Sequence, residues 1–270
     1  MQRDFSEELQ RIYNGSPDEL LLHTARYERL LALYHLSFPG QTSAFIVRAP
    51  GRVNLIGEHT DYNGYPVMPM AIDRDFVFIL APRTDGTIDI VNESPSFERR
   101  TFDARFPVSP YHQGDWGNYI KAAVHGILEA GWVDPKKAAG FQAIVGGTIP
   151  ESAGLSSSSA LVVASALAFL TANNKRIDKD HLAELLARAE RYVGSEGGGM
   201  DQAVSLLAET GKALKIDFFP LRTQPVSLPE NLSFVVCNSL IRAPKSESIR
   251  YAYNRRVIEC RLATALVFVR

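Results

Sequence analysis

Residues 48–64 read RAPGRVNLIGEHTDYNG, a run in which charged and polar side chains lie close together among glycines. The residues of interest are Arg52, Glu58, His59 and Asp61, and glycines at positions 51, 57 and 64 permit sharp turns around them. Carboxylates and an imidazole accept from and donate to several hydroxyls at once, as a bound monosaccharide requires. A solvated, charged turn explains any one of these residues taken alone, but the four together favour a sugar-binding site.

A second segment, residues 146–160, reads GGTIPESAGLSSSSA and leads directly into a strongly apolar stretch. Its glycines let backbone amides turn toward a ligand, its serines add hydroxyls, and a following helix would point the positive end of its dipole at the loop. A plain serine N-cap explains the spacing equally well. The Gly-Lys-Ser/Thr end of a Walker loop is absent, so the segment predicts a phosphate loop of another ATP-using fold.

The third segment, residues 190–202, reads ERYVGSEGGGMDQ. Asp201 lies just after three glycines, in the first turn of a predicted helix, so a substrate could approach its carboxylate closely. An aspartate at this position also stabilises a helix simply by opposing its dipole. Taken alone, the segment does not decide between these two explanations.

Composition limits the functional classes. The chain is 46% hydrophobic and 22% charged, which is typical of a soluble globular protein, and a net charge of -1 provides no electrostatic footprint for nucleic acid or an anionic membrane. Cys237 and Cys260 are too few for a disulfide scaffold and lack metal-ligand spacing. Without a secretory signal or a membrane-spanning apolar run, a cytoplasmic protein is expected.

Hydrophobic periodicity predicts a mixture of helices and strands. Helices are expected within the first 40 residues and over residues 116–128, 156–173, 181–192, 200–208 and 251–269. Strands are expected over residues 44–48, 76–80, 141–145, 213–218 and 232–237, with a further strand pattern between residues 88 and 106 and a turn at Pro50 and Gly51. A domain boundary is expected near residue 215.

The three segments, in this order, resemble the galactokinase branch of the GHMP kinases, named for galactokinase, homoserine kinase, mevalonate kinase and phosphomevalonate kinase. Residues 51–64 are similar to the sugar signature of that branch almost letter for letter, residues 150–160 to the second motif of the superfamily, and residues 198–202 to the segment with the catalytic aspartate. The resemblance implies an α/β (two-layer α+β) fold. Residues 1–214 would form a domain similar to the second domain of ribosomal protein S5, and residues 215–270 the start of an incomplete ferredoxin-like domain.

The resemblance also implies a chemistry: ATP-dependent phosphorylation of the C1 hydroxyl of a free hexose, with galactose as the first choice. Asp201 and Arg52 would be catalytic. The sugar would contact Arg52, Glu58, His59, Asp61, Gly198, Asp201 and Tyr253. ATP would contact Trp116, Gly154, Leu155, Ser156, Ser157, Ser158 and Ser159, and Mg²⁺ would be held by Ser158 and Glu190.

Several alternatives remain. Residues 190–202 resemble N-acetylgalactosamine kinases and plant galactokinases, whereas Tyr253 is similar to the residue of galactose-specific members, so N-acetylgalactosamine and arabinose follow galactose as candidate sugars. The third family motif is missing, which points to a carboxy-terminally truncated chain. The apolar residues of the last predicted helix then lack cover, so self-association through the incomplete domain is considered. Three alternatives belong to other functional classes: a non-catalytic sensor of sugar and ATP, an inactive fragment and a generic nucleotide-binding module.

Overall fold

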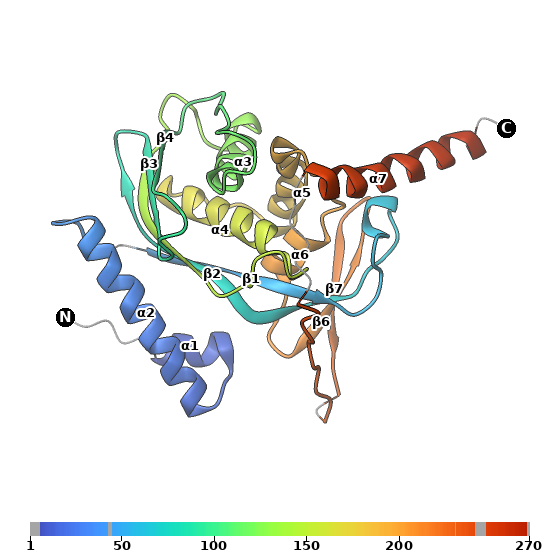
Figure 1. The fold of residues 1–270 in the computed structure, drawn as a ribbon, viewed down its shortest axis with the longest axis horizontal. Coiled ribbons are helices and arrows are strands. Elements are labelled where there is room, and N and C mark those ends of the chain that lie inside the picture. The colour runs from blue at the N-terminus through green and yellow to red at the C-terminus, as the bar shows by residue number, and fades with distance from the viewer. Residues whose placement is uncertain (1–5, 43–44, 230, 241–246, 269–270) are drawn as a thin grey trace.

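The computed structural model describes residues 6–42, 45–229, 231–240 and 247–268 (Figure 1). Its centre is a five-stranded sheet with the strand order β1-β2-β5-β3-β4. The strands are β1 (Phe45–Asn54), β2 (Pro69–Arg83), β3 (Thr87–Asn92), β4 (Arg100–Asp103) and β5 (Gly140–Gly147). β3 and β5 pair in parallel, and the other neighbours pair in antiparallel fashion. The expected mixed α/β fold is confirmed.

Alternation along β2 gives the sheet two apolar faces. Phe78 and Leu80 join one buried cluster, while Val77 and Ile79 join another, because successive side chains of a strand point to opposite faces. The first cluster packs against four helices: α3 (Gly117–Glu129), α4 (Ser157–Ala172), α5 (Lys179–Ala189) and α6 (Met200–Leu207). The second packs against α1 (Ser6–Tyr13) and α2 (Pro17–Ser37), on the other side of the sheet in Figure 1. The amino-terminal helices therefore add a layer to the sheet and the four helices behind it.

The amino-terminal helices are held to the sheet by a buried ion pair. The Asp75 side chain on β2 is fully buried, and Arg26 on α2 donates to it at 2.6 Å. Arg48 on β1 and the Tyr13 hydroxyl on α1 donate to the same carboxylate. A buried carboxylate is tolerated only when it is paired and hydrogen-bonded in this way. α2 begins with a capping box between Ser16 and Glu19.

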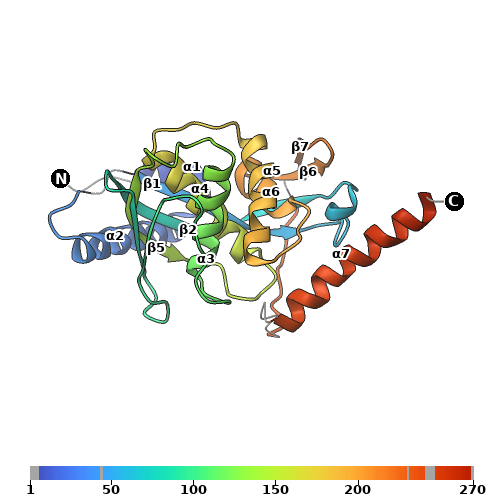
Figure 2. The same ribbon diagram turned by 90° about the horizontal axis from the view of Figure 1, so that it is seen from above.

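Two elements lie beyond the central sheet. A hairpin of β6 (Lys212–Asp217) and β7 (Arg222–Ser227) bridges to Val67 through Ile216, so the expected boundary at residue 215 falls inside β6. α7 (Glu247–Phe268) projects from the body of the molecule (Figures 1 and 2). None of the helices in the described residues is long and apolar enough to cross a bilayer.

Two local predictions are wrong. Pro50 and Gly51 do not end the first strand: β1 continues to Asn54, and a register shift between Pro50 and Arg52 absorbs the irregularity. Residues 232–237 form no strand in the described part of the chain, and Val235 is 84% exposed. Their β-branched and aromatic residues suit a strand, but strand propensity alone does not supply a neighbouring strand to pair with.

Candidate active site

One arginine joins the three segments that the sequence singles out. The Arg52 Nε atom on β1 donates to Asp201 Oδ1 at 2.6 Å, and its Nη1 atom donates to the Gly154 carbonyl at 2.8 Å. The Ser159 hydroxyl lies 3.5 Å from the other Asp201 carboxylate oxygen. The signature, the serine-rich loop and the first turn of α6 therefore meet at one place.

Close backbone approach brings β1 against the serine-rich loop. The Arg52 amide donates to the Leu155 carbonyl at 3.2 Å. A Cβ atom on Gly51 would lie 2.8 Å from that carbonyl oxygen, closer than side-chain atoms normally come. Glycine is therefore needed at position 51 for a packing reason, because only a residue without a side chain leaves room for the loop.

The serine-rich loop ends at the amino terminus of α4, a helix of 16 residues with no acidic residue in its first turn. Ser156 precedes the helix with φ 59°, and its hydroxyl oxygen is buried without a hydrogen-bond partner in the described part of the chain. The serine thus does not act as an ordinary side-chain cap, which was the alternative explanation for this segment. The amides of the first helical turn, the helix dipole and nearby hydroxyls suit a phosphate group.

Asp201 is placed by another close backbone contact. It lies in the first turn of α6, after Gly199 in the left-handed region at φ 106°. A Cβ atom on Gly198 would lie 2.4 Å from the backbone nitrogen of Tyr62 and 2.5 Å from the carbonyl carbon of Asp61. The Gly198 amide instead donates to Asp61 Oδ2 at 3.2 Å. Gly198 thus lets the Asp201 segment pack directly on the sugar signature.

Asp61 and Asp201 form an interacting pair of carboxylates. Asp61 begins the short helix η1 (Asp61–Asn63) and is buried. Burial raises the pKa of Asp61, and the Asp201 carboxylate raises it further, although amides of Tyr62, Met200 and Gly198 act in the opposite direction. A hydroxylated ligand that donated to both carboxylates would replace the water that each has lost.

Aromatic side chains stand beside this pair. The ring centroids of His59 and Tyr253 are 5.3 Å apart, and those of Tyr62 and Tyr253 are 6.0 Å apart. His59 Nδ1 and the Tyr62 hydroxyl are 2.9 Å apart, within hydrogen-bond distance. Burial, followed by the charges of Asp61 and Asp201, raises the pKa of Tyr253, so its phenol stays neutral.

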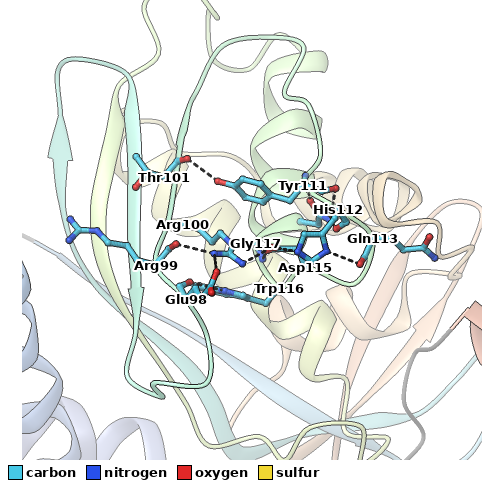
Figure 3. Close-up of polar contacts among 11 residues, drawn as sticks. Glu98, Arg99, Arg100, Thr101, Tyr111, His112, Gln113, Asp115, Trp116 and Gly117 are labelled. Carbon is cyan, nitrogen blue, oxygen red and sulfur yellow. Dashed lines mark hydrogen bonds and ion pairs between the residues drawn. The ribbon is translucent and has the colours of Figure 1, made fainter.

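Two of the expected site residues, Glu58 and Trp116, take no part in the hydrogen bonds that join Arg52, Asp61 and Asp201 to their neighbours in the described part of the chain. Glu58 is exposed and makes no hydrogen bond or ion pair within the described residues. Trp116 precedes α3 and is nearly buried, with its indole nitrogen donating to the Glu98 carbonyl at 3.1 Å (Figure 3). Its polar atom is therefore already used, and a nucleotide base could contact only the ring.

The expected metal ligands lie on two elements. Ser158 is in the first turn of α4, and Glu190 is buried at the start of η2 (Glu190–Val193). The described residues contain no cluster of three or more His, Cys, Asp or Glu side chains arranged for a metal ion. A Mg²⁺ ion in a kinase takes only one or two protein oxygens and completes its shell with phosphates and water. A hydroxyl and a carboxylate fit that pattern of donors.

An ion cluster beside Trp116 was not expected from the sequence. Asp115 pairs with Arg100 of β4 at 2.8 Å and accepts from the Gly117 amide at 2.8 Å, which fixes the start of α3 (Figure 3). Glu98 pairs with the same arginine at 2.9 Å. Arg100 and Asp115 are 15 positions apart in the sequence, and they meet because the loop between β4 and α3 returns to the sheet edge. Local sequence patterns do not reveal such pairs.

Comparison with known proteins agrees with this geometry. Residues 33–82 match the family described as the galactokinase galactose-binding signature, and residues 118–209 match the GHMP kinases N terminal domain. Galactokinase from Dictyostelium discoideum is 40% identical over 251 residues, which cover 90% of this chain and 49% of that protein. Both matched regions are those of GHMP kinases, and the first is the signature of their galactokinase branch.

Another galactokinase and two solved structures are also similar to this chain. Galactokinase from Candida parapsilosis is 39% identical over 254 residues, covering 91% of this chain and 50% of that protein. The structure of Lactococcus lactis galactokinase complexed with galactose superposes with a TM-score of 0.72 at 27% identity, covering 88% of this chain and 60% of that one. Methanococcus jannaschii mevalonate kinase, with a TM-score of 0.56 at 24% identity over 68% of this chain and 56% of that one, shares the fold. The chain spans about half the length of the curated galactokinases that it matches.

Proposed function

We propose that this site transfers the γ-phosphoryl group of ATP to the C1 hydroxyl of a free hexose. The observation that carries the proposal is the position of Arg52, which contacts both Asp201 and the backbone of the serine-rich loop. A sugar hydroxyl beside Asp201 and a phosphate chain on the loop would then be neighbours. Phosphoryl transfer depends mainly on such positioning and on balancing charge.

Asp201 is the proposed proton acceptor. Its carboxylate is partly exposed, so it can face the sugar hydroxyl, accept its proton or orient it for attack. Arg52 balances the carboxylate charge and holds one carboxylate oxygen, leaving the other near Ser159. The same guanidinium can offset charge on the phosphoryl group as the bond to ADP breaks.

The remaining site residues divide between the two substrates. For the sugar we propose contacts with Arg52, Glu58, His59, Asp61, Gly198 and Tyr253. For ATP we propose contacts with Trp116, Gly154, Leu155, Ser156, Ser157, Ser158 and Ser159. Ser158 and Glu190 would hold Mg²⁺, which neutralises phosphate charge when bound.

Galactose is the proposed sugar. The signature match and the names of the galactokinase relatives support it, and the buried Asp61 beside Tyr253 gives a polar group and an apolar ring face of the kind a pyranose contacts. N-acetylgalactosamine and arabinose are the competing substrates. We also propose that residues 1–214 and 215–270 belong to separate domains and that the protein acts in the cytoplasm.

A coupled ADP-release assay tests the proposal. Galactose, N-acetylgalactosamine and arabinose are supplied with MgATP to this chain and to a chimaera extended by the part of the Dictyostelium discoideum galactokinase that the chain does not match. Galactose should stimulate ADP release most. Asp201→Ala should keep galactose affinity within a few fold but lose about 100-fold or more in rate.

Two results would contradict the proposal. Turnover like that of the wild type in Asp201→Ala would remove the assigned role of the aspartate. Absence of sugar-stimulated ADP release from both proteins, with galactose and ATP still binding, would favour the non-catalytic sensor.

A further inference from the structure

α7 contacts the site with two adjacent residues. Tyr253 packs against His59 on the sugar side, whereas Asn254 reaches the loop that precedes Asp201. The Asn254 Nδ2 atom donates to the Gly194 carbonyl at 2.8 Å, and its Oδ1 atom accepts from the Glu196 amide at 3.2 Å. One amide side chain thus binds two backbone groups of residues 194–199, which we term the glycine loop.

The glycine loop has few constraints of its own. Gly194 and Gly199 adopt positive φ angles of 82° and 106°, and a Cβ atom on Gly197 would meet nothing within 4 Å. Glycines have the widest range of backbone conformations, so a loop with three in succession needs outside contacts to keep one shape. The Gly198 amide bonds to Asp61 near the end of the loop, and Asn254 holds its beginning.

The two contacts that hold the glycine loop, with Asp61 and with Asn254, lie beside residues of the proposed reaction. Ser195 donates its amide to the Glu190 carbonyl at 3.2 Å, so the start of the loop is continuous with the proposed metal ligand. Asp201 follows the loop by two residues. A change in the path of the glycine loop would therefore shift Asp201 relative to a sugar held by Asp61 and Tyr253.

The attachment of α7 does not rest on Asn254 alone. Val257 on the same helix is fully buried, and Arg261 pairs with Glu196 at 3.2 Å. What Asn254 adds is a matched donor and acceptor, which only an amide side chain offers in this geometry. Its contact therefore concerns the conformation of the loop more than the docking of the helix.

We propose that Asn254 is a positioning residue for phosphoryl transfer, which holds the glycine loop so that Asp201 faces the sugar. The proposal rests on the proposed function. Its physical basis is that a misplacement of about 1 Å at a reacting group can cost about 100-fold in rate. Asn254 itself need not touch sugar or ATP.

The test compares Asn254→Ala and Asn254→Asp with the wild type. Asn254→Asp keeps the shape but turns the donor toward Gly194 into an acceptor, and Asn254→Gln is the conservative variant. Arg255→Gln, next along the helix and exposed, is the matched control. Hydrogen exchange at the Glu196 amide and the kcat and KM for galactose are measured, and thermal unfolding shows whether each variant folds.

The proposal predicts faster exchange at Glu196, a fall in kcat of about 10-fold to 100-fold and a galactose KM within a few fold of the wild type in Asn254→Ala and Asn254→Asp. Asn254→Gln should recover part of kcat, and Arg255→Gln should match the wild type. Unchanged kcat with a raised KM would reduce Asn254 to a support for α7 and overturn the proposal, as would unchanged exchange. If the wild type shows no sugar-stimulated turnover, the proposed function fails, whereas the exchange result still decides whether Asn254 holds the loop.

Discussion

The centre of the site and α7 are built in different ways. Around Arg52 and Asp201, strand β1, helix α4 and helix α6 belong to one buried cluster, and the two side chains are 13% and 29% exposed. On α7, Val257 is fully buried, but Leu262 and Leu266 are 59% and 72% exposed. The proposed phosphoryl-transfer side is thus fixed by the core, while the proposed sugar side also depends on a helix that makes few buried contacts.

This difference separates stability from activity. A change in the core around Gly198 should affect both, because the same packing positions Asp201 and supports the fold. A change on α7 can alter the site while most of the core stays intact. Substitutions chosen from the two regions can therefore test whether they are energetically distinct.

The largest expected effect on stability is at Gly198. In Gly198→Ala the new methyl group would collide with the backbone of Asp61 and Tyr62, so the free energy of unfolding should fall by about 3 kcal/mol and galactose binding should weaken. Gly197→Ala is the control, because nothing lies within 4 Å of its Cβ atom. Urea unfolding and calorimetric titration measure the two quantities. Equal stability of the two variants would show that the close contact is not required.

A paired comparison along α7 should give a smaller effect. Val257→Ala removes buried methyl groups and should lower the free energy of unfolding by about 2 kcal/mol, whereas Leu262→Ala should change it by less than about 0.5 kcal/mol. Urea unfolding at several protein concentrations provides the measurement. An equal cost for Leu262→Ala, growing with concentration, would mean that a second copy covers this face, as the self-association considered from the sequence requires.

The smallest effect is expected at Asp115, away from α7. Burial tends to raise the pKa of Asp115, but Arg100 and the Gly117 amide outweigh it and lower the pKa below its ordinary value. A lowered folded-state pKa adds stability above the ordinary value of about 4 and loses it as the pH falls through the folded-state value. Asp115→Asn should therefore cost about 1.5 kcal/mol at pH 7 and progressively less below about pH 4.

Glu98→Gln is the control for Asp115, because Glu98 pairs with the same arginine but its side chain is 83% exposed. Its cost should stay below about 0.5 kcal/mol at every pH. Thermal unfolding between pH 3 and pH 7 measures both variants. A cost for Asp115→Asn that does not depend on pH would show that the ion pair contributes little.

Sequence patterns predicted helix α4 well because its apolar stretch is too long for a strand and begins with polar serines. Residues 156–173 were expected to be helical, and α4 spans Ser157–Ala172. β7 was missed because Pro225 obscures its pattern, although a proline is tolerated in an edge strand. The contact of Asn254 with Gly194 and Glu196 could not be predicted from sequence, because it joins residues about 60 positions apart.

The candidate site also contains both residues that the sequence identified and a residue that only the structure revealed. Arg52, Asp61 and Asp201 stand in distinctive glycine-rich surroundings, and the structure brings them together as expected. Tyr62 was not singled out, although it lies within the signature and contacts His59. Its signal was present in the motif, but an aromatic residue next to Asp61 has no chemical role until its neighbours in space are known.

A crystal structure of this chain with galactose and a non-hydrolysable ATP analogue would test the central claim most directly. We expect the C1 hydroxyl of galactose within about 2.6–3.2 Å of the Asp201 carboxylate, and the triphosphate at the amino terminus of α4. A sugar bound away from Asp61 and Asp201, or a triphosphate bound away from the serine-rich loop, would contradict it.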